Sequence, residues 1–288
     1  MTRAFSRRQL FTDSARASLC AVCGRAPLPV PVSRLNVFVW LRGGADALSL
    51  LVPYRDDAYY RARPRTALLP PGRALGSALP LTSEFALHPQ LAPLLPLLRE
   101  GEAAIVLGVG ESNFCASHAD AERALQGALE RVAGTVVAQP SEAPLAAQFA
   151  ALAALFQRGA APACASIEAR GWDTHAAQGR GGQGLLAAAV ADLSQSLCEF
   201  RRGLGSAWRN VRVVVASEFG RSLNETALAG TDDGHASIAL LLGAPQPASI
   251  IGQPPSLQPA GLSQARHLFP HRTLESVLRA HWLEERNA

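Results

Sequence analysis

The amino-acid sequence predicts an α/β domain built on a mostly parallel central sheet that is flanked by helices. Two observations lead to this fold class: apolar runs of strand length recur along the chain, and helical patterns lie between them. The runs are apolar throughout rather than alternating with polar residues, which is typical of strands buried on both faces of a parallel sheet. Strands that alternate with helices also imply crossover connections in an open sheet.

Five apolar runs are predicted to be strands. The first is bounded by Gly43 and Gly44, the second by Gly110 and the fifth by Gly243, so each of them ends where the backbone can turn. The fourth is the clearest, because most of its residues are valine, a residue that favours strands. The predicted strands cover residues 36–41, 103–109, 164–167, 211–216 and 238–242.

Helical patterns fill the intervals between these runs. Residues 91–98 carry leucines at the i, i+3, i+4 and i+7 positions of one helical face, and residues 185–200 alternate an apolar stripe with polar residues. The segment 64–80 is rich in proline and glycine, so we expect it to be irregular. The predicted helices cover residues 91–98, 117–129, 144–157, 185–200 and 272–282.

The composition is that of a globular protein, with 48% hydrophobic and 17% charged residues. The formal net charge is +4, and all 27 basic residues are arginines scattered along the chain, so nucleic acid is not an expected partner. The 5 cysteines have irregular spacing and do not form a disulfide framework. No segment is long and apolar enough to predict a stable membrane span.

Residues 1–33 are predicted to be a leader of the twin-arginine type. Arg7 and Arg8 precede apolar residues, as they do in twin-arginine export signals. The apolar stretch that follows is interrupted by Arg25, so it is too broken to span a membrane. The leader predicts a periplasmic or secreted protein that uses the twin-arginine export machinery, with residues 34–288 as a single domain. The alternative is a disordered arginine-rich tail.

Polar side chains that can bind a metal gather next to the predicted strands. Because the carboxyl ends of parallel strands share one edge of a sheet, we expect the side chains that follow the strands to converge there. Carboxylates and imidazoles bind divalent ions such as zinc, manganese or calcium, and such an ion can activate a nucleophile for attack on a phosphoryl or sulfuryl group. The candidate ligands are Asp46, Asp173, His175, Glu218, Asp232, Asp233 and His235, and Ser117 and His118 follow the second strand.

Each of these clusters also has a purely structural interpretation. Asp173 can cap the start of a helix, and Glu218 with Arg221 can form a surface ion pair. Asp232 and Asp233 precede a glycine, which is the composition of an ordinary turn. A shared site is indicated by the combined placement of the clusters at successive strands, not by any one of them.

The motifs of this chain resemble the bacterial family known as domain of unknown function 1501. The most distinctive are WLRGGAD at 40–46, GWDTH at 171–175, SEFGR at 217–221 and TDDGH at 231–235. They run in family order across most of the chain from residue 35 onward. Members of this family are exported and are grouped with the alkaline phosphatase–sulfatase superfamily, so the resemblance implies an alkaline phosphatase-like fold.

The resemblance also implies roles for the residues at the strand ends. In the superfamily, aspartates and histidines at these positions bind one or two divalent metals beside a nucleophile. An arginine can pair with an anionic substrate group, because its fork matches phosphate or sulfate. By resemblance the metal ligands are Asp46, Asp173, His175, Asp232 and His235, the residues that touch substrate are Ser117 or His118, and Arg221 pairs with the anionic group.

Two departures from the family pattern bear on activity. The family usually has Asp-His-Gly where this chain has Asp232, Asp233 and Gly234, so a carboxylate replaces an imidazole and favours a harder ion. The chain is also shorter than usual members between His118 and Ala147, a region that helps to build the pocket wall in the superfamily.

Three functions stay open at this point. The first is a metal-dependent hydrolase of phosphate or sulfate esters, which the retained aspartates and histidines favour. The second is a catalytically degenerate relative that binds an envelope partner or polymer, which Asp233 and the shortening favour. The third is a structural factor that accompanies another exported protein.

Overall fold

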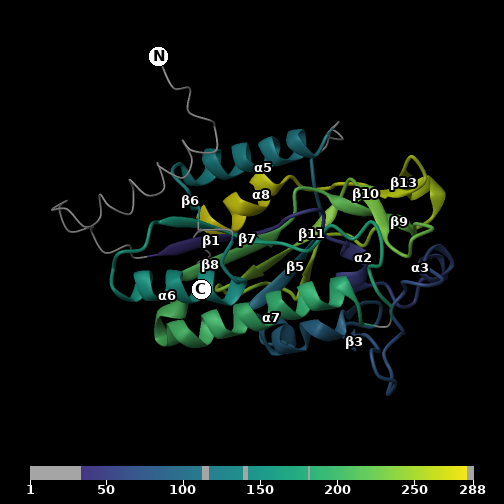
Figure 1. Cartoon of the computed structure of the whole chain (residues 1–288), viewed down its shortest axis with the longest axis horizontal. Coiled ribbons are helices and arrows are strands. Elements are labelled where there is room, and N and C mark those ends of the chain that lie inside the picture. The colour runs from purple at the N-terminus through teal and green to yellow at the C-terminus, as the bar shows by residue number, and fades with distance from the viewer. Residues whose placement is uncertain (1–33, 112–116, 139–141, 181, 284–288) are drawn as a thin grey trace, which may run out of the picture.

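The structure is a computed structural model that describes residues 34–111, 117–138, 142–180 and 182–283 (Figure 1). Its centre is a seven-stranded sheet in the order β12-β5-β11-β8-β1-β7-β6. The leader predicted over residues 1–33, with Arg7 and Arg8, lies outside the described residues.

The predicted fold class is confirmed. All five predicted strands are present, and the two further strands, β6 and β12, are two-residue edge strands that are too short to show a sequence pattern. The sheet consists of β1 (Leu35–Leu41), β5 (Ala103–Val109), β6 (Val137–Ala138), β7 (Cys164–Ala169), β8 (Val211–Ala216), β11 (Ser237–Leu242) and β12 (Ile250–Ile251).

One strand runs against the others. The pairs β1–β7, β1–β8, β6–β7 and β5–β12 are parallel, whereas β11 is antiparallel to both of its neighbours, β5 and β8. The reversal matters for the site, because it places the start of β11 at the edge where β1, β7 and β8 end. The residues that precede β11 therefore lie at the carboxyl edge of the sheet, which is the region where ligands bind in open α/β sheets.

Helices cover both faces of the sheet (Figure 1). On one face, α5 (His118–Ala133) and α8 (Leu274–Leu278) share an apolar cluster with β1 and β8. On the other face, α6 (Leu145–Gln157) and α7 (Leu185–Leu204) pack against the opposite sides of the same strands. Each strand therefore presents apolar side chains to both layers, and this explains the continuous apolar runs in the sequence.

The helix predicted over 91–98 is divided in two. A 3-10 helix, η1 (Pro89–Leu94), is followed by a short α-helix, α4 (Leu95–Arg99). Pro93 and Pro96 explain the division, because proline lacks the N–H that continues an α-helix. The predicted C-terminal helix likewise consists of α8 and a π-helical turn, η4 (Arg279–Leu283).

A hairpin and further short elements complete the fold, and the hairpin lies at the carboxyl edge of the sheet beside the predicted site. A hairpin of β9 (Gly220–Glu225) and β10 (Thr231–Gly234) follows β8, and the sequence analysis did not predict it. The remaining elements are α2 (Ala47–Leu50), β2 (Leu51–Val52), α3 (Asp57–Ala62), β3 (Leu79–Pro80), β4 (Ala86–Leu87), η2 (Gly205–Asn210), η3 (Pro259–Gly261), β13 (Leu262–Ser263) and β14 (His267–Leu268). Within the described ranges, none of the helices combines the length and the apolar character needed to cross a bilayer.

His88 is a buried titratable group that links the fold to pH. Its ring nitrogen Nδ1 accepts a hydrogen bond from the Gln90 N–H at 3.1 Å and so caps η1. Burial lowers the pKa of His88 to about 4, although the nearby charge of Asp46 acts in the opposite direction. The folded protein therefore keeps this ring neutral at pH values where an unfolded chain binds a proton.

We expect the stability of the protein to fall as the pH drops from 6.5 towards 4, because only the unfolded chain gains the His88 proton in that window. The lowered pKa of His88 corresponds to a loss of about 3 kcal/mol in the free energy of unfolding once the pH is below both pKa values. A His88→Asn variant keeps a side-chain acceptor for the cap and cannot titrate. We measure the free energy of unfolding in urea at several pH values. The value for the variant minus that for wild type should rise as the pH falls towards 4, and a difference that stays constant with pH would contradict this assignment.

Candidate functional site

The loops after β1, β7 and β8 meet the β9–β10 hairpin at the carboxyl edge of the sheet. The approach is close: Gly43 has a φ of +110°, and a Cβ at this position would lie 2.7 Å from the backbone nitrogen of Asp173. Only glycine accommodates both the positive φ and the contact. This packing brings together residues that are far apart in the sequence.

Arg221, in β9, lies at the centre of this edge with its side chain fully buried (0% exposed). Its Nε donates to the carbonyl oxygen of Gly44 at 3.0 Å, and Nη1 donates to that of Thr231 at 2.9 Å. Its Nη2 donates to the carbonyl oxygens of Gly43 and Trp172. One guanidinium thus ties the loops after β1 and β7 to β10.

Two carboxylates and two imidazoles lie around this guanidinium, and these four side chains form what we call the exposed edge: His118, Asp173, His175 and Asp233. Arg221 is 3.1 Å from Oδ1 of Asp173 and 3.2 Å from Oδ1 of Asp233. Nδ1 of His175 lies 2.5 Å from Oδ1 of Asp173, and Nε2 of His118 lies 2.6 Å from Oδ2 of Asp233. Asp173 and His118 are 61% and 56% exposed, so the edge is open to solvent above a buried charge.

The charge of Arg221 acts on the exposed edge. Partial burial by itself raises the pKa of the Asp173 carboxyl, but hydrogen bonds from His175 and Arg221, with their charges, outweigh it and hold that pKa below its ordinary value. The Asp173 carboxyl is therefore ionised at neutral pH. Arg221 itself presents no free N–H to a ligand, because its donors face carbonyl oxygens, the His175 ring and the Asp173 carboxylate.

Asp46 lies apart from the exposed edge, in a pocket of its own. Its carboxylate is 1% exposed and accepts two hydrogen bonds from Arg63, at 2.6 and 2.9 Å. Oδ2 also accepts from the Ser49 hydroxyl at 2.7 Å and from Nε2 of Gln178 at 2.7 Å. Burial by itself raises the pKa of Asp46, but Arg63, Ser49 and Gln178 together lower it below its ordinary value.

Glu218 organises the loop after β1 from inside. Its Oε1 accepts from the backbone N–H of Gly43 at 2.8 Å, and its Oε2 accepts from Nε1 of Trp40 at 2.9 Å. The hydroxyl of Ser217 lies 2.9 Å from the same Oε2. Glu218 is buried and does not pair with Arg221, so the surface ion pair considered for these two residues is not formed.

The other predicted site residues lie around the margin. Asp232 is half-exposed, with Oδ2 3.5 Å from Nη2 of Arg266. The ring of His235 stacks on that of His267 at a centroid distance of 4.6 Å. Ser117 caps α5, since its hydroxyl oxygen accepts from the Asp120 N–H at 3.2 Å and donates to the Asp120 carboxylate at 2.8 Å.

The predicted metal ligands do not fit one ion as they are arranged here. The positions where a cation would face Asp46, Asp173 and Asp233 hold the guanidinium groups of Arg63 and Arg221. Among the residues that the structure describes, no group of three or more His, Cys, Asp and Glu side chains is placed to hold a metal. The binding of a divalent ion stays a prediction, which metal analysis can test.

Sequence reasoning missed two residues of this region, Arg63 and Gln178. Arg63 stands in a segment with several arginines (YYRARPR at 59–65), so its spacing does not distinguish it from surface residues. The available signal was Asp46 itself, because a carboxylate in the loop after a buried strand needs a counter-charge if it too is buried. Gln178 joins Asp46 to Thr231, whose hydroxyl donates to Oε1 of Gln178 at 2.9 Å, and no sequence pattern marks it.

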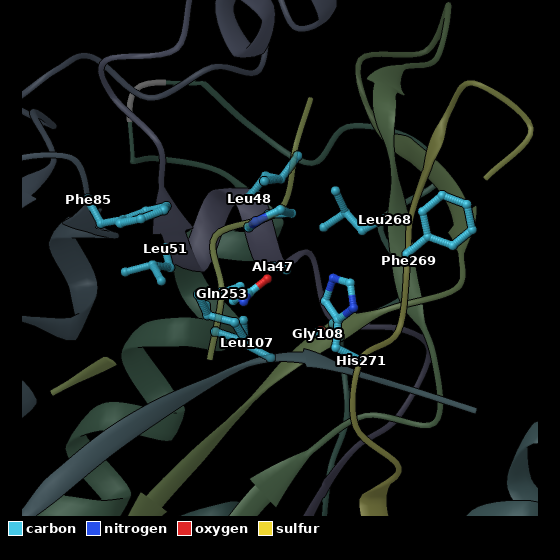
Figure 2. A pocket seen from close by; sticks show the side chains of 13 residues that line it. Ala47, Leu48, Leu51, Phe85, Leu107, Gly108, Gln253, Leu268, Phe269 and His271 are labelled. Atoms are coloured by element: carbon cyan, nitrogen blue, oxygen red, sulfur yellow. The ribbon is translucent and has the colours of Figure 1, made fainter. Parts of the chain in front are cut away.

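An apolar pocket lies beside α2, separate from the exposed edge (Figure 2). About 390 Å3 of space lies between its walls when the adjoining open solvent is counted. Leu48, Leu107 and Leu268 form apolar walls, while His271 and Gln253 bring polar groups to it. None of the predicted site residues that the structure describes lines this pocket.

Replacing Arg221 by methionine should destabilise the fold by about 3–5 kcal/mol, because carbonyl groups of the loops after β1 and β7 and of β10 lose their shared donor and two carboxylates lose their counter-charge. Urea unfolding measures the change. Arg266→Ala is the matched control, since Arg266 is half-exposed and its contact with Asp232 is 3.5 Å long, so we expect a cost below about 1 kcal/mol. Equal losses in the two variants would contradict a central role for Arg221.

Comparison with known proteins agrees with three of the four motifs, since the matched range includes residues 171–175, 217–221 and 231–235 but not 40–46. A search of curated proteins gave no match. A family described as "Protein of unknown function (DUF1501)" matches residues 119–268, a range that includes Asp173, His175, Glu218 and the β9–β10 hairpin. The match covers just over half of the 288 residues. The chain therefore belongs to the DUF1501 family.

Proposed function

We propose that this chain is an exported DUF1501 protein that binds a hydroxyl-rich envelope polymer at the exposed edge without using a divalent metal. One observation carries the proposal: the cation among the exposed carboxylates is the buried side chain of Arg221. The single charge of Arg221 lies between two carboxylates, and the outward-facing groups of the edge are the carboxylates and imidazoles of His118, Asp173, His175 and Asp233.

The chemistry of these groups favours a neutral ligand with many hydroxyls. An ionised carboxylate accepts hydrogen bonds, and an imidazole can donate or accept according to its tautomer. Hydroxyl groups of a polysaccharide can meet both needs. The ring of His118 also lies 4.8 Å from that of the buried Phe219, which holds the exposed imidazole in place at the edge.

A metal-dependent hydrolase of phosphate or sulfate esters receives less support from this arrangement. An anionic ester would approach the carboxylates of Asp173 and Asp233, which repel it. Arg221 was expected to pair with the anion, but its N–H groups are already engaged by carbonyl oxygens and carboxylates. Ser117, a candidate contact with substrate, is engaged in capping α5.

We expect His118→Ala and Asp173→Asn each to weaken the binding of the purified protein to bacterial cell-wall polysaccharide by about tenfold, as measured by co-sedimentation. This is the effect of losing one hydrogen bond between the ligand and the edge. Asp192→Asn is the matched control, because this exposed carboxylate lies within α7. Thermal unfolding of each variant checks that the fold is intact.

The same experiment separates binding from metal-dependent hydrolysis. We expect binding to persist after treatment with a chelator, and metal analysis of the exported protein to show much less than one ion per chain. Stoichiometric zinc, manganese or calcium, together with release of phosphate or sulfate from ester substrates, would favour the hydrolase instead. Binding that is unaffected by both edge variants would place the polymer site elsewhere.

Export forms part of the proposal, and Arg7 and Arg8 support it by their position before apolar residues. Conservative replacement of both by lysine should leave the protein in the cytoplasm, because the export machinery reads the arginine pair itself. Fractionation of cells that express each form measures this. Arg25→Lys is the control, since Arg25 lies outside the pair, and continued export of the double variant would argue against the twin-arginine route.

A further inference from the structure

The pocket around Asp46 has the donor and acceptor pattern of a binding site for one planar cation. Arg63, at the end of α3, fills it with a fully buried side chain. Its Nη1 and Nη2 bond the two oxygens of Asp46, and Nη1 also lies 3.2 Å from the Ser49 hydroxyl. Nη2 donates to the carbonyl oxygen of Ser222 at 2.8 Å, and Nε donates to that of Leu223 at 2.7 Å.

These contacts match a guanidinium group as a whole. A guanidinium of arginine has five N–H donors in a fixed plane, and the pocket offers an acceptor for each of them. The carboxylate of Asp46 supplies the balancing charge. The aromatic ring of Tyr59, with its centroid 5.7 Å from Cζ of Arg63, adds a surface that favours a delocalised cation.

The acceptors come from elements other than the one that carries Arg63. Asp46 ends the loop after β1 and precedes α2, which contains Ser49. Ser222 and Leu223 belong to β9. Gln178 joins from the segment before α7 and donates to both Asp46 and Ser49. The pocket is therefore built by the scaffold, and Arg63 enters it as a ligand carried on a neighbouring segment.

We propose that the Asp46 pocket is a guanidinium-binding site whose resident ligand is the side chain of Arg63. Its specificity is for a planar guanidinium and not for a spherical metal ion, because the acceptors are arranged around five coplanar donors. The proposal is independent of the ligand of the exposed edge. It implies that a free guanidinium ion can enter the pocket when the side chain is truncated.

Arg63→Ala tests this inference, with full-length protein and thermal unfolding as the measurement. The variant should unfold at a lower temperature than wild type, and millimolar guanidinium chloride should raise its Tm saturably, by about 3–5 °C at ten times the dissociation constant. Sodium chloride at equal ionic strength should have no such effect. Arg65→Ala is the matched control, because Arg65 is half-exposed and bonds Glu225 instead of Asp46.

Several results would overturn the inference. The Tm of Arg63→Ala could rise equally with guanidinium chloride and sodium chloride, or Arg65→Ala could show the same rise. Either result would show that no specific site was opened. A Tm of Arg63→Ala that rises with magnesium, manganese or zinc but not with guanidinium would identify a metal-binding pocket instead. An Arg63→Lys variant as stable as wild type would exclude guanidinium specificity.

A folding defect of Arg63→Ala would leave the test intact. In that case the variant is refolded from urea with and without guanidinium chloride, and the yield of folded protein is measured by circular dichroism. Recovery that depends on guanidinium supports the site, whereas failure under both conditions contradicts the claim that a free ion can replace the side chain.

Discussion

The buried charge of Arg221 is the constraint on which the carboxyl edge of this domain depends. A guanidinium with no solvent exposure is tolerated only when its donors are satisfied and its charge is balanced. Here the acceptors belong to the loops after β1 and β7 and to β10, so they hold these segments in one arrangement. The internal bonds of Glu218 to Trp40 and Gly43 support the same loop from below.

The two buried arginines divide the acidic residues of this region into two kinds. Asp46 is buried with Arg63, and its carboxylate oxygens accept hydrogen bonds from Arg63 and Gln178 inside the domain. Asp173 and Asp233 share Arg221 from the solvent side, and the Asp173 side chain is the more exposed of the two. The exposed edge is consequently a polar surface over a fixed positive charge, and its carboxylates and imidazoles are the groups that a ligand meets first.

The sequence predicted the sheet well because its buried strands are continuous apolar runs, such as the valine-rich β8. It also placed Asp173, His175 and Asp233 at one edge, where the structure brings them together. It could not reveal that β11 runs antiparallel, since direction is set by the hairpin β9–β10 and by pairing with β5 and β8. Nor could it identify Arg63, because burial and partners depend on tertiary contacts and not on local pattern.

The internal guanidinium in the Asp46 pocket has a consequence for how the protein matures. A pocket that is filled by a side chain is complete as soon as the polypeptide has folded, and its occupant is encoded in the gene. In the proposed guanidinium site, ligand and pocket therefore belong to one polypeptide, and they come together in the same folding event.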